Sequence, residues 1–155
     1  RDCLIAQRCS ARLAEAVNAP SLRSCVLPGF LVVCGGDDGE HALSSGELFD
    51  IGQNRWEPLP NMSVSRCSTS VAELDGVLYV VGGTDGSRAL PSVESLDVLK
   101  ALASKGAVGW RQEFQMSTAR CRAAVVAVDG RLMVAGGSNG SEVLPSAEVF
   151  TKNDG

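Results

Sequence analysis

The 155-residue sequence contains a single histidine, His41, and a single tyrosine, Tyr79. A metal site built on several histidines is therefore impossible within one copy, and a catalytic triad has only His41 available. No apolar run approaches the roughly 20 residues that a membrane-spanning helix needs, since one of the longest, 123–128, has six. The start shows no signal-peptide layout. Because residue 1 is Arg and not Met, we expect the chain to begin inside a longer sequence.

Charge of either sign is also modest. Fourteen Lys and Arg stand against 18 Asp and Glu, a net charge of −4. This balance argues against a broad surface for nucleic acid or for an anionic membrane, so we expect neither as a partner. Hydrophobic residues make up 45% and charged residues 21% of the chain, values typical of a folded domain. Seventeen glycines with six prolines indicate many tight turns.

One phrase occurs three times along the chain. It is an apolar run closed by two glycines and followed by Asp-Gly or Asn-Gly, and its copies are 31–36, 78–83 and 132–137. Such a run predicts a buried strand that leads into a turn. Internal repeats of roughly 40–50 residues are typical of propeller blades.

The residues around each phrase keep the same register. Eleven residues after the second glycine comes a glutamate, and both tryptophans lie 26 residues before the next doublet. Ten residues after each Trp comes Arg-Cys, with Met four residues before the Arg. We therefore expect units of four short strands with periods of 47 and 54 residues. The predicted units are 8–60, 66–114 and 120–151, and the last lacks its outer strand.

These phrases resemble the kelch repeat, which has a Gly-Gly doublet, a downstream Glu, an outer-strand Trp and a Met-x-x-x-Arg connection. The resemblance implies an all-β fold, a segment of a kelch-type β-propeller with about three four-stranded blades that do not close a ring. The residues that carry it are expected to be architectural: Gly35, Gly36, Gly82, Gly83, Gly136, Gly137, Glu47, Glu94, Glu148, Trp56, Trp110, Arg66 and Arg120.

Two loops of the predicted blades are longer than their counterparts. Arg8-Cys9 matches Arg66-Cys67, which places the first inner strand at 8–17 and an insertion at 18–28 between the first and second strands. In the alternative interpretation, residues 13–17 belong to a helix before the domain. The second unit has seven extra residues between its third and outer strands, near 99–107. Both insertions fall on one face of the propeller.

The opposite face keeps constant loop lengths, at 37–45, 84–92 and 138–146. The kelch resemblance implies a protein-interaction module that binds partners through these loops and the blade-to-blade connections. It also implies a possible substrate-recruiting role in a larger ubiquitin-ligase adaptor. The polar candidates for partner binding are Arg88, Arg122, Asp37, Asp38, Glu40, His41, Asp85 and Asn139. Because they carry both signs of charge, the preference for acidic motifs found in some kelch proteins does not transfer.

Enzymatic kelch propellers match the sequence less well. Copper oxidases of this kind need two tyrosines and two histidines, and the iron-dependent plant specifier proteins need Glu-x-x-x-Asp-x-x-x-His; the chain has neither set. We therefore expect no enzyme, no cofactor and no metal. The alternatives left open are a propeller enzyme acting on a carbohydrate or small molecule, and an actin-binding scaffold.

The six cysteines include no CxxC pair, and Cys9, Cys67 and Cys121 share one repeat position. This pattern favours reduced thiols and an intracellular, cytoplasmic protein. Closed propellers have four to eight blades, so three blades leave two open sides. We expect a second copy, or a separate chain from the same parent, to cover them.

Overall fold

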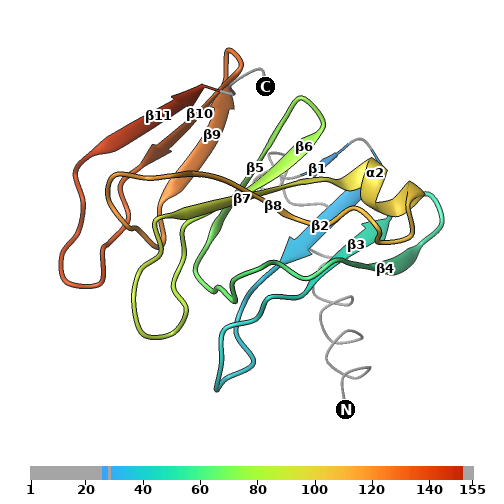
Figure 1. The fold of residues 1–155 in the computed structure, drawn as a ribbon, viewed down its shortest axis with the longest axis horizontal. Coiled ribbons are helices and arrows are strands. Elements are labelled where there is room, and N and C mark those ends of the chain that lie inside the picture. The colour runs from blue at the N-terminus through green and yellow to red at the C-terminus, as the bar shows by residue number, and fades with distance from the viewer. Residues whose placement is uncertain (1–25, 28, 152–155) are drawn as a thin grey trace.

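The computed structural model describes residues 26–27 and 29–151, which form three antiparallel sheets placed side by side (Figure 1). In each sheet the strands follow one another in chain order. The first sheet contains β1 (Val26–Leu27), β2 (Phe30–Cys34), β3 (Gly46–Asp50) and β4 (Arg55–Leu59). The second contains β5 (Ser70–Leu74), β6 (Val77–Val81), β7 (Ser92–Asp97) and β8 (Arg111–Gln115). The third contains β9 (Ala124–Val128), β10 (Arg131–Ala135) and β11 (Ala147–Thr151).

This arrangement of four, four and three strands confirms the predicted incomplete all-β propeller. A short helix, α2 (Val98–Ala103), lies in the connection from β7 to β8, where the extra residues near 99–107 were predicted. The carboxylate of Asp97 caps this helix by accepting a hydrogen bond from the Lys100 N–H at 3.0 Å. In the described residues, no helix is long and apolar enough to cross a membrane.

The innermost strand of the first sheet differs from the prediction. Val26–Leu27 forms β1 within the segment 18–28 that was expected to be a loop insertion, and Leu27 pairs directly with Phe30. The connection to β2 is therefore a tight turn like those of the other sheets, and Gly29 adopts the positive φ of +87° that such turns favour. The alternatives for residues 8–17, a strand or a preceding helix, lie outside the described residues.

Apolar side chains fill the two spaces between neighbouring sheets. Between the first and second sheets, Val32 and Leu48 pack in one cluster with Leu78 and Leu96. Between the second and third sheets, a cluster of buried side chains contains Ala72, Tyr79, Val81, Val93, Leu132 and Val134. Because the second sheet is covered on both faces, all five residues of β6 are buried. In β10, by contrast, buried and exposed residues alternate.

The glycine doublets lie where one sheet meets the next. Gly82 has a φ of +60°, and a Cβ added there would overlap the carbonyl oxygen of Arg120, which precedes the third sheet. The next amide, Gly83 N–H, donates to the same carbonyl at 3.0 Å. Gly35 meets the Arg66 carbonyl in the same way. The doublets therefore allow a close backbone approach that a side chain would block.

Gly136 offers a matched control for this packing. Its φ of +67° resembles that of Gly82, but an added Cβ would meet only the Leu144 oxygen, at 3.8 Å. We predict that Gly82→Ala lowers the free energy of unfolding by about 2–4 kcal/mol, because strain and overpacking add. Gly136→Ala should cost only the strain, about 1–2 kcal/mol. Urea unfolding of both variants tests this, and equal losses would contradict the close approach.

Candidate functional site

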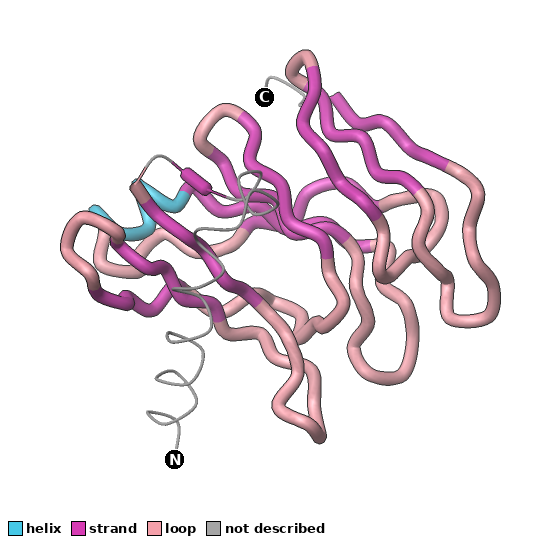
Figure 2. Tube along the Cα trace, turned by 180° about the vertical axis from the view of Figure 1, so that it is seen from behind, coloured by secondary structure: helices cyan, strands magenta, loops and turns pink. Residues whose placement is uncertain are grey.

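Three long loops extend on the same side of the molecule, away from the short hairpins and α2 (Figures 1 and 2). They are residues 37–45, 84–92 and 138–146, and with the connections that precede β5 and β9 we call them the loop face. Each loop contains one isolated antiparallel bridge at the same repeat position: Asp37 with Ala42, Thr84 with Ala89, and Ser138 with Val143. The loops therefore share one backbone conformation.

The tip of each loop is a turn held by a side-chain carbonyl or carboxylate oxygen. Oδ1 of Asp38 accepts hydrogen bonds from the N–H groups of Glu40 and His41, at 2.9 and 2.7 Å. Asp85 and Asn139 make the same two bonds within their own loops. These three predicted binding candidates are therefore engaged in shaping the turns. Asp37 likewise accepts from the Gly39 N–H, at 2.8 Å.

The fourth residue of each turn occupies one position but differs in chemistry. It is His41 in the first loop, Arg88 in the second and Glu142 in the third, and all three are exposed. Glu142 was absent from the sequence-based candidates, although its offset from the doublet equals that of His41 and Arg88. The loop face therefore presents an imidazole, a guanidinium and a carboxyl side chain at equivalent positions of one repeated turn.

These hydrogen bonds also determine the ionisation of the turn carboxylates. Bonds from the backbone N–H groups of Ser87 and Arg88 stabilise the charged form of Asp85 and hold its pKa well below 3.8. The pKa of Asp38 is lowered by the corresponding bonds from His41 and Glu40. Both groups stay anionic over the physiological pH range.

Arg122 lies in the connection that precedes β9, which is part of the loop face. Its φ is +54°, and the corresponding residue of the second sheet, Ser68, has a φ of +51°. The Arg122 N–H donates to the Ser68 carbonyl at 2.9 Å, which joins the two connections. Its side chain is exposed, as is that of Glu40 in the first loop. The loop candidates therefore lie on one face, and each turn carboxylate or amide bonds within its own loop.

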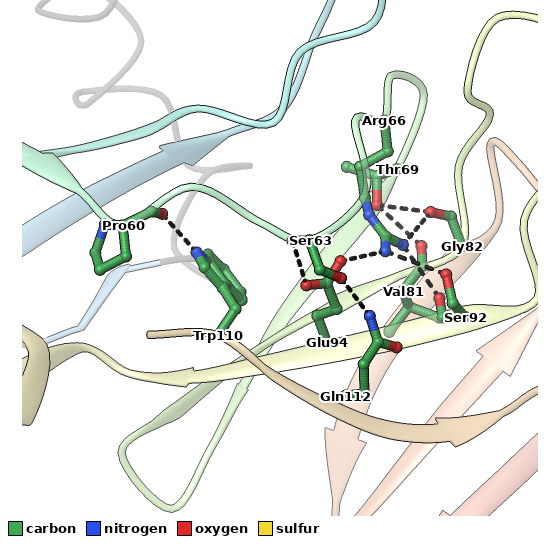
Figure 3. A network of polar contacts seen from close by, with 10 residues as sticks. All are labelled: Pro60, Ser63, Arg66, Thr69, Val81, Gly82, Ser92, Glu94, Trp110 and Gln112. Carbon is green, nitrogen blue, oxygen red and sulfur yellow. Dashed lines mark hydrogen bonds and ion pairs between the residues drawn. The ribbon is translucent and has the colours of Figure 1, made fainter. Parts of the chain in front are cut away.

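Beneath the loop face, Arg66 and Glu94 form a buried ion pair (Figure 3). Arg66 Nη2 lies 2.6 Å from Glu94 Oε1, and both side chains are fully buried. The same guanidinium donates to the carbonyls of Gly82 and Ser92, at 2.8 and 3.1 Å. Glu94 accepts a further bond from the Ser63 N–H at 2.8 Å. Through these bonds, Arg66 joins the segment that precedes β5 to the glycine doublet and to β7.

The third sheet repeats this arrangement with Arg120 and Glu148, 2.8 Å apart. Burial of Glu148 raises its pKa, but hydrogen bonds from the Ser117 backbone and Arg120 outweigh this effect, so the pKa lies below its ordinary value. Glu47, the equivalent residue of the first sheet, lies on β3 opposite Val33 and Pro58. In the second and third repeats, the arginine that pairs with this glutamate stands 16 residues before the glycine doublet. In the first repeat, the residue at that position is Ala19.

The two tryptophans share a repeat position but not their partners. Trp110 donates from Nε1 to the carbonyl of Pro60 at 2.7 Å, which ties the second blade to the connection before it (Figure 3). Trp56 contacts the ring of Phe49, with centroids 5.1 Å apart. Among the described residues, no hydrogen-bond partner reaches the buried Nε1 of Trp56.

The opposite face has a pocket that the sequence did not reveal. It has a volume of about 410 Å³ and lies between β4 and the insertion that carries α2. Its lining includes Glu57, Leu59, Leu102 and Lys105. In the described part of the chain, no cluster of three His, Cys, Asp or Glu side chains is suited to a metal ion.

The sequence was compared with models of known protein families. The kelch motif matches three stretches of the chain, at residues 21–63, 65–101 and 119–152. The chain belongs to the kelch-repeat family. Each match falls on one sheet, although the second match ends before the outer strand β8, so the kelch repeats form successive blades of an incomplete β-propeller.

Among solved structures, the kelch chain is similar to that published as "Structure of YjhT", with a TM-score of 0.66 and 12% sequence identity. The match covers 81% of this chain and 41% of the other, so the chain spans less than half of that protein. At this identity the similarity concerns the fold alone. No curated protein sequence matches the chain.

We predict that Arg66→Met lowers the free energy of unfolding by about 3–5 kcal/mol, because it leaves Glu94 charged and buried without its partner. Arg120→Met should cost less, because Glu148 keeps 15% of its side chain exposed. Thermal and urea unfolding measure both. The double variant Arg66→Met/Glu94→Leu should recover part of the loss, and a double variant worse than the single would contradict this account.

The turn carboxylates predict a pH dependence. Since the folded pKa of Asp85 is depressed, its stabilising effect is complete above the unfolded pKa of about 4 and is lost as pH falls toward the folded value. Asp85→Asn keeps the acceptor, as Asn139 does in the third loop, but cannot titrate. We expect the melting temperature of Asp85→Asn to fall less between pH 5 and pH 2, whereas Asp85→Ala is destabilised at neutral pH. Identical pH profiles would contradict the assignment.

Proposed function

We propose that this kelch segment is a protein-interaction module that binds its partner through the loop face. The observation that supports the proposal most is the repeated turn, in which one hydrogen-bonded frame presents His41, Arg88 and Glu142 at equivalent positions. A fixed backbone with variable exposed side chains lowers the entropic cost of binding. It also gives each blade a separate contact with a partner.

The chemistry of the loop face favours a partner with both signs of charge. Arg88 is 81% exposed, and its Nε lies 3.4 Å from Asp85 Oδ2, an ion pair that water largely screens. Its guanidinium therefore remains available to a carboxylate on the partner. Arg122 adds a second exposed cation, while Glu40 and Glu142 add anions. Charges of both signs across an interface raise the association rate with a complementary partner and disfavour partners with like charges at the same places.

In the finer form of the proposal, the module recruits substrates for a ubiquitin-ligase adaptor and acts by binding instead of catalysis, without a cofactor. It works inside the cell, in the cytoplasm. Cys67 and Cys121, which are thiols in the structure, support this location because a reducing compartment preserves them.

The experiment is a comparison of partner affinity between the parent chain and Arg88→Glu/Arg122→Glu. Proteins retained by the immobilised chain are identified by mass spectrometry, and the affinity for each is then measured with purified components. We expect the double variant to bind at least about tenfold more weakly, as expected when charge pairs become like-charge contacts. Arg131→Glu, at the opposite end of the third sheet, should leave the affinity unchanged.

Unchanged affinity of the double variant for every identified partner would overturn the assignment of these two arginines. The alternative function, action on a carbohydrate or small molecule, is tested by measuring the thermal shift of the chain with a panel of glycans and metabolites. A strong ligand-induced shift without any protein partner would replace the interaction module with a propeller that acts on small molecules.

A further inference from the structure

The third loop contains the one Asn-Gly pair of the sequence, Asn139-Gly140. The other four asparagines are followed by Ala, Arg, Met and Asp. An asparagine before glycine is the most prone to deamidation, because glycine has no side chain to shield its backbone nitrogen. Gly140 is exposed, and beyond its chain neighbours no atom lies within 4 Å of the position of an added Cβ. The nitrogen of Gly140 is therefore sterically open.

The exposure of this tip is a property of the repeated turn. In the second loop, which the third sheet flanks, the equivalent residues Gly86, Ser87 and Arg88 are also exposed. Gly86 has the same open space, and its φ of +99° is close to the +98° of Gly140. In both loops the hydrogen bonds that shape the tip run within the loop. The surroundings of Asn139 are therefore determined by its own loop.

The turn holds the groups that react in a deamidation close together. Asn139 Oδ1 accepts hydrogen bonds from the N–H groups of Ser141 and Glu142, both at 2.9 Å, so the side chain folds back over Gly140. These donors polarise the bond between Cγ and Oδ1 and stabilise the negative charge that develops on Oδ1 when Cγ is attacked. One bond opposes the attack, because the Gly140 N–H donates to Ser138 Oγ at 3.1 Å and holds the nitrogen in place.

Aspartate already fills the position of Asn139 in the other two loops. Asp38 and Asp85 accept the same pair of backbone hydrogen bonds through Oδ1. An aspartate at position 139 therefore fits the turn without a change in the backbone.

The group that faces the turn side chain differs between the loops. Asp85 Oδ2 lies 3.4 Å from the guanidinium Nε of Arg88. In the third loop, Asn139 Nδ2 donates to Glu142 Oε1, also at 3.4 Å. A carboxylate thus faces a cation in the second loop, whereas an amide faces a carboxylate in the third. Loss of the amide nitrogen would place two carboxylates next to each other, which repel.

We propose that Asn139 is a deamidation site, and that its conversion to aspartate replaces the amide facing Glu142 with a carboxylate. The backbone nitrogen of Gly140 attacks Cγ of Asn139 and forms a cyclic imide. The bond from Cγ to Nδ2 breaks, and ammonia leaves with the proton of the Gly140 N–H. Solvent water then adds to Cγ and breaks the new bond from Cγ to the nitrogen, which gives aspartate. Addition of water to the backbone carbonyl of residue 139 gives isoaspartate instead.

The turn favours aspartate over isoaspartate. The two N–H donors polarise the carbonyl at Cγ, where addition of water gives aspartate. Isoaspartate carries an extra carbon in the backbone, which displaces those donors. The product is also stable, because the equivalent bonds from Ser87 and Arg88 hold the pKa of Asp85 below its ordinary value. An aspartate in this turn stays ionised, and an ionised carboxylate resists renewed attack.

The consequence for recognition rests on the function proposed for the loop face. Conversion adds a negative charge beside the exposed Glu142 and removes the hydrogen bond that holds its carboxylate. Repulsion turns Glu142 away from position 139. The third loop then presents two carboxylates, which attract a cationic side chain of the partner and repel an anionic one.

Ageing of the folded 155-residue chain at neutral pH, followed by peptide mapping with mass spectrometry, tests the conversion. A synthetic peptide of residues 134–145 is the unfolded reference. We expect Asn139 to convert in the chain no more than about tenfold more slowly than in the peptide, because the single opposing hydrogen bond is worth at most about that much. Asn54, which precedes Arg55, is the internal control and should stay intact.

Two variants separate the turn from the local sequence. Ser138→Ala removes the opposing bond and should speed conversion in the chain by up to about tenfold, but not in the peptide. Asp85→Asn creates a second Asn-Gly pair in the same frame, and position 85 should convert at a similar rate. The chain should yield more aspartate than isoaspartate, and the peptide the reverse.

Conversion of Asn139 slower than this limit would overturn the proposal, as would equal rates in the parent and in Ser138→Ala. Equal ratios of aspartate to isoaspartate in chain and peptide would contradict the part assigned to the donors of the turn.

The effect on recognition is measured with the partners identified for the loop face. Asn139→Asp should change the affinity about threefold, the size of an exposed ion-pair contact, and the change should shrink as salt is raised. Asn54→Asp adds the same charge in the turn between β3 and β4, away from the loop face, and should leave the affinity unchanged. Unchanged affinity of Asn139→Asp would show that the new carboxylate does not affect recognition and would overturn this consequence. Failure of the loop-face function itself is distinct, because it appears in Arg88→Glu/Arg122→Glu, whereas conversion of Asn139 is measured without a partner.

Discussion

The contact between a glycine doublet and the arginine carbonyl of the next blade is the constraint on which the structure depends. At Gly35 and Gly82 the backbones of successive blades approach more closely than any side chain allows, and the following amides donate to the same carbonyl. The arginine that supplies this carbonyl turns its side chain into its own blade and pairs with Glu94 or Glu148. One residue therefore fixes both the spacing between blades and the connection within a blade.

The loop face follows from this constraint. The doublet begins each long loop, and the Leu43 and Leu90 carbonyls near its end accept the N–H groups of the junction arginines. Both ends of the first two loops are therefore fixed to the next blade, and the Asx-type turns fix their tips. In a frame held in this way, the side chains at the fourth turn position can vary without altering the backbone. This separation of frame and recognition residue supports the interaction function proposed for the kelch segment.

The sequence predicted the propeller because its signals repeat: doublets, glutamates, tryptophans and arginines recur at fixed offsets. It did not predict that Arg66 pairs with Glu94, since a contact across 28 residues depends on how β7 folds back. The first inner strand was misplaced because the match of Arg8-Cys9 outweighed a better local signal, Leu27-Pro28-Gly29-Phe30, which resembles Leu74-Asp75-Gly76-Val77. The sequence also did not show that Asp38, Asp85 and Asn139, which it predicted as partner contacts, hold the loop turns through hydrogen bonds.

Native-state hydrogen exchange of the doublet amides tests the central constraint most directly. The Gly36 and Gly83 N–H groups donate across the junctions, so the account predicts strong protection from exchange that is lost only on unfolding. The Gly137 N–H has the same place in the repeat but faces the open side of the third sheet, so it should exchange much faster. Rapid exchange at Gly36 and Gly83, or equal protection at Gly137 in the isolated chain, would contradict the account.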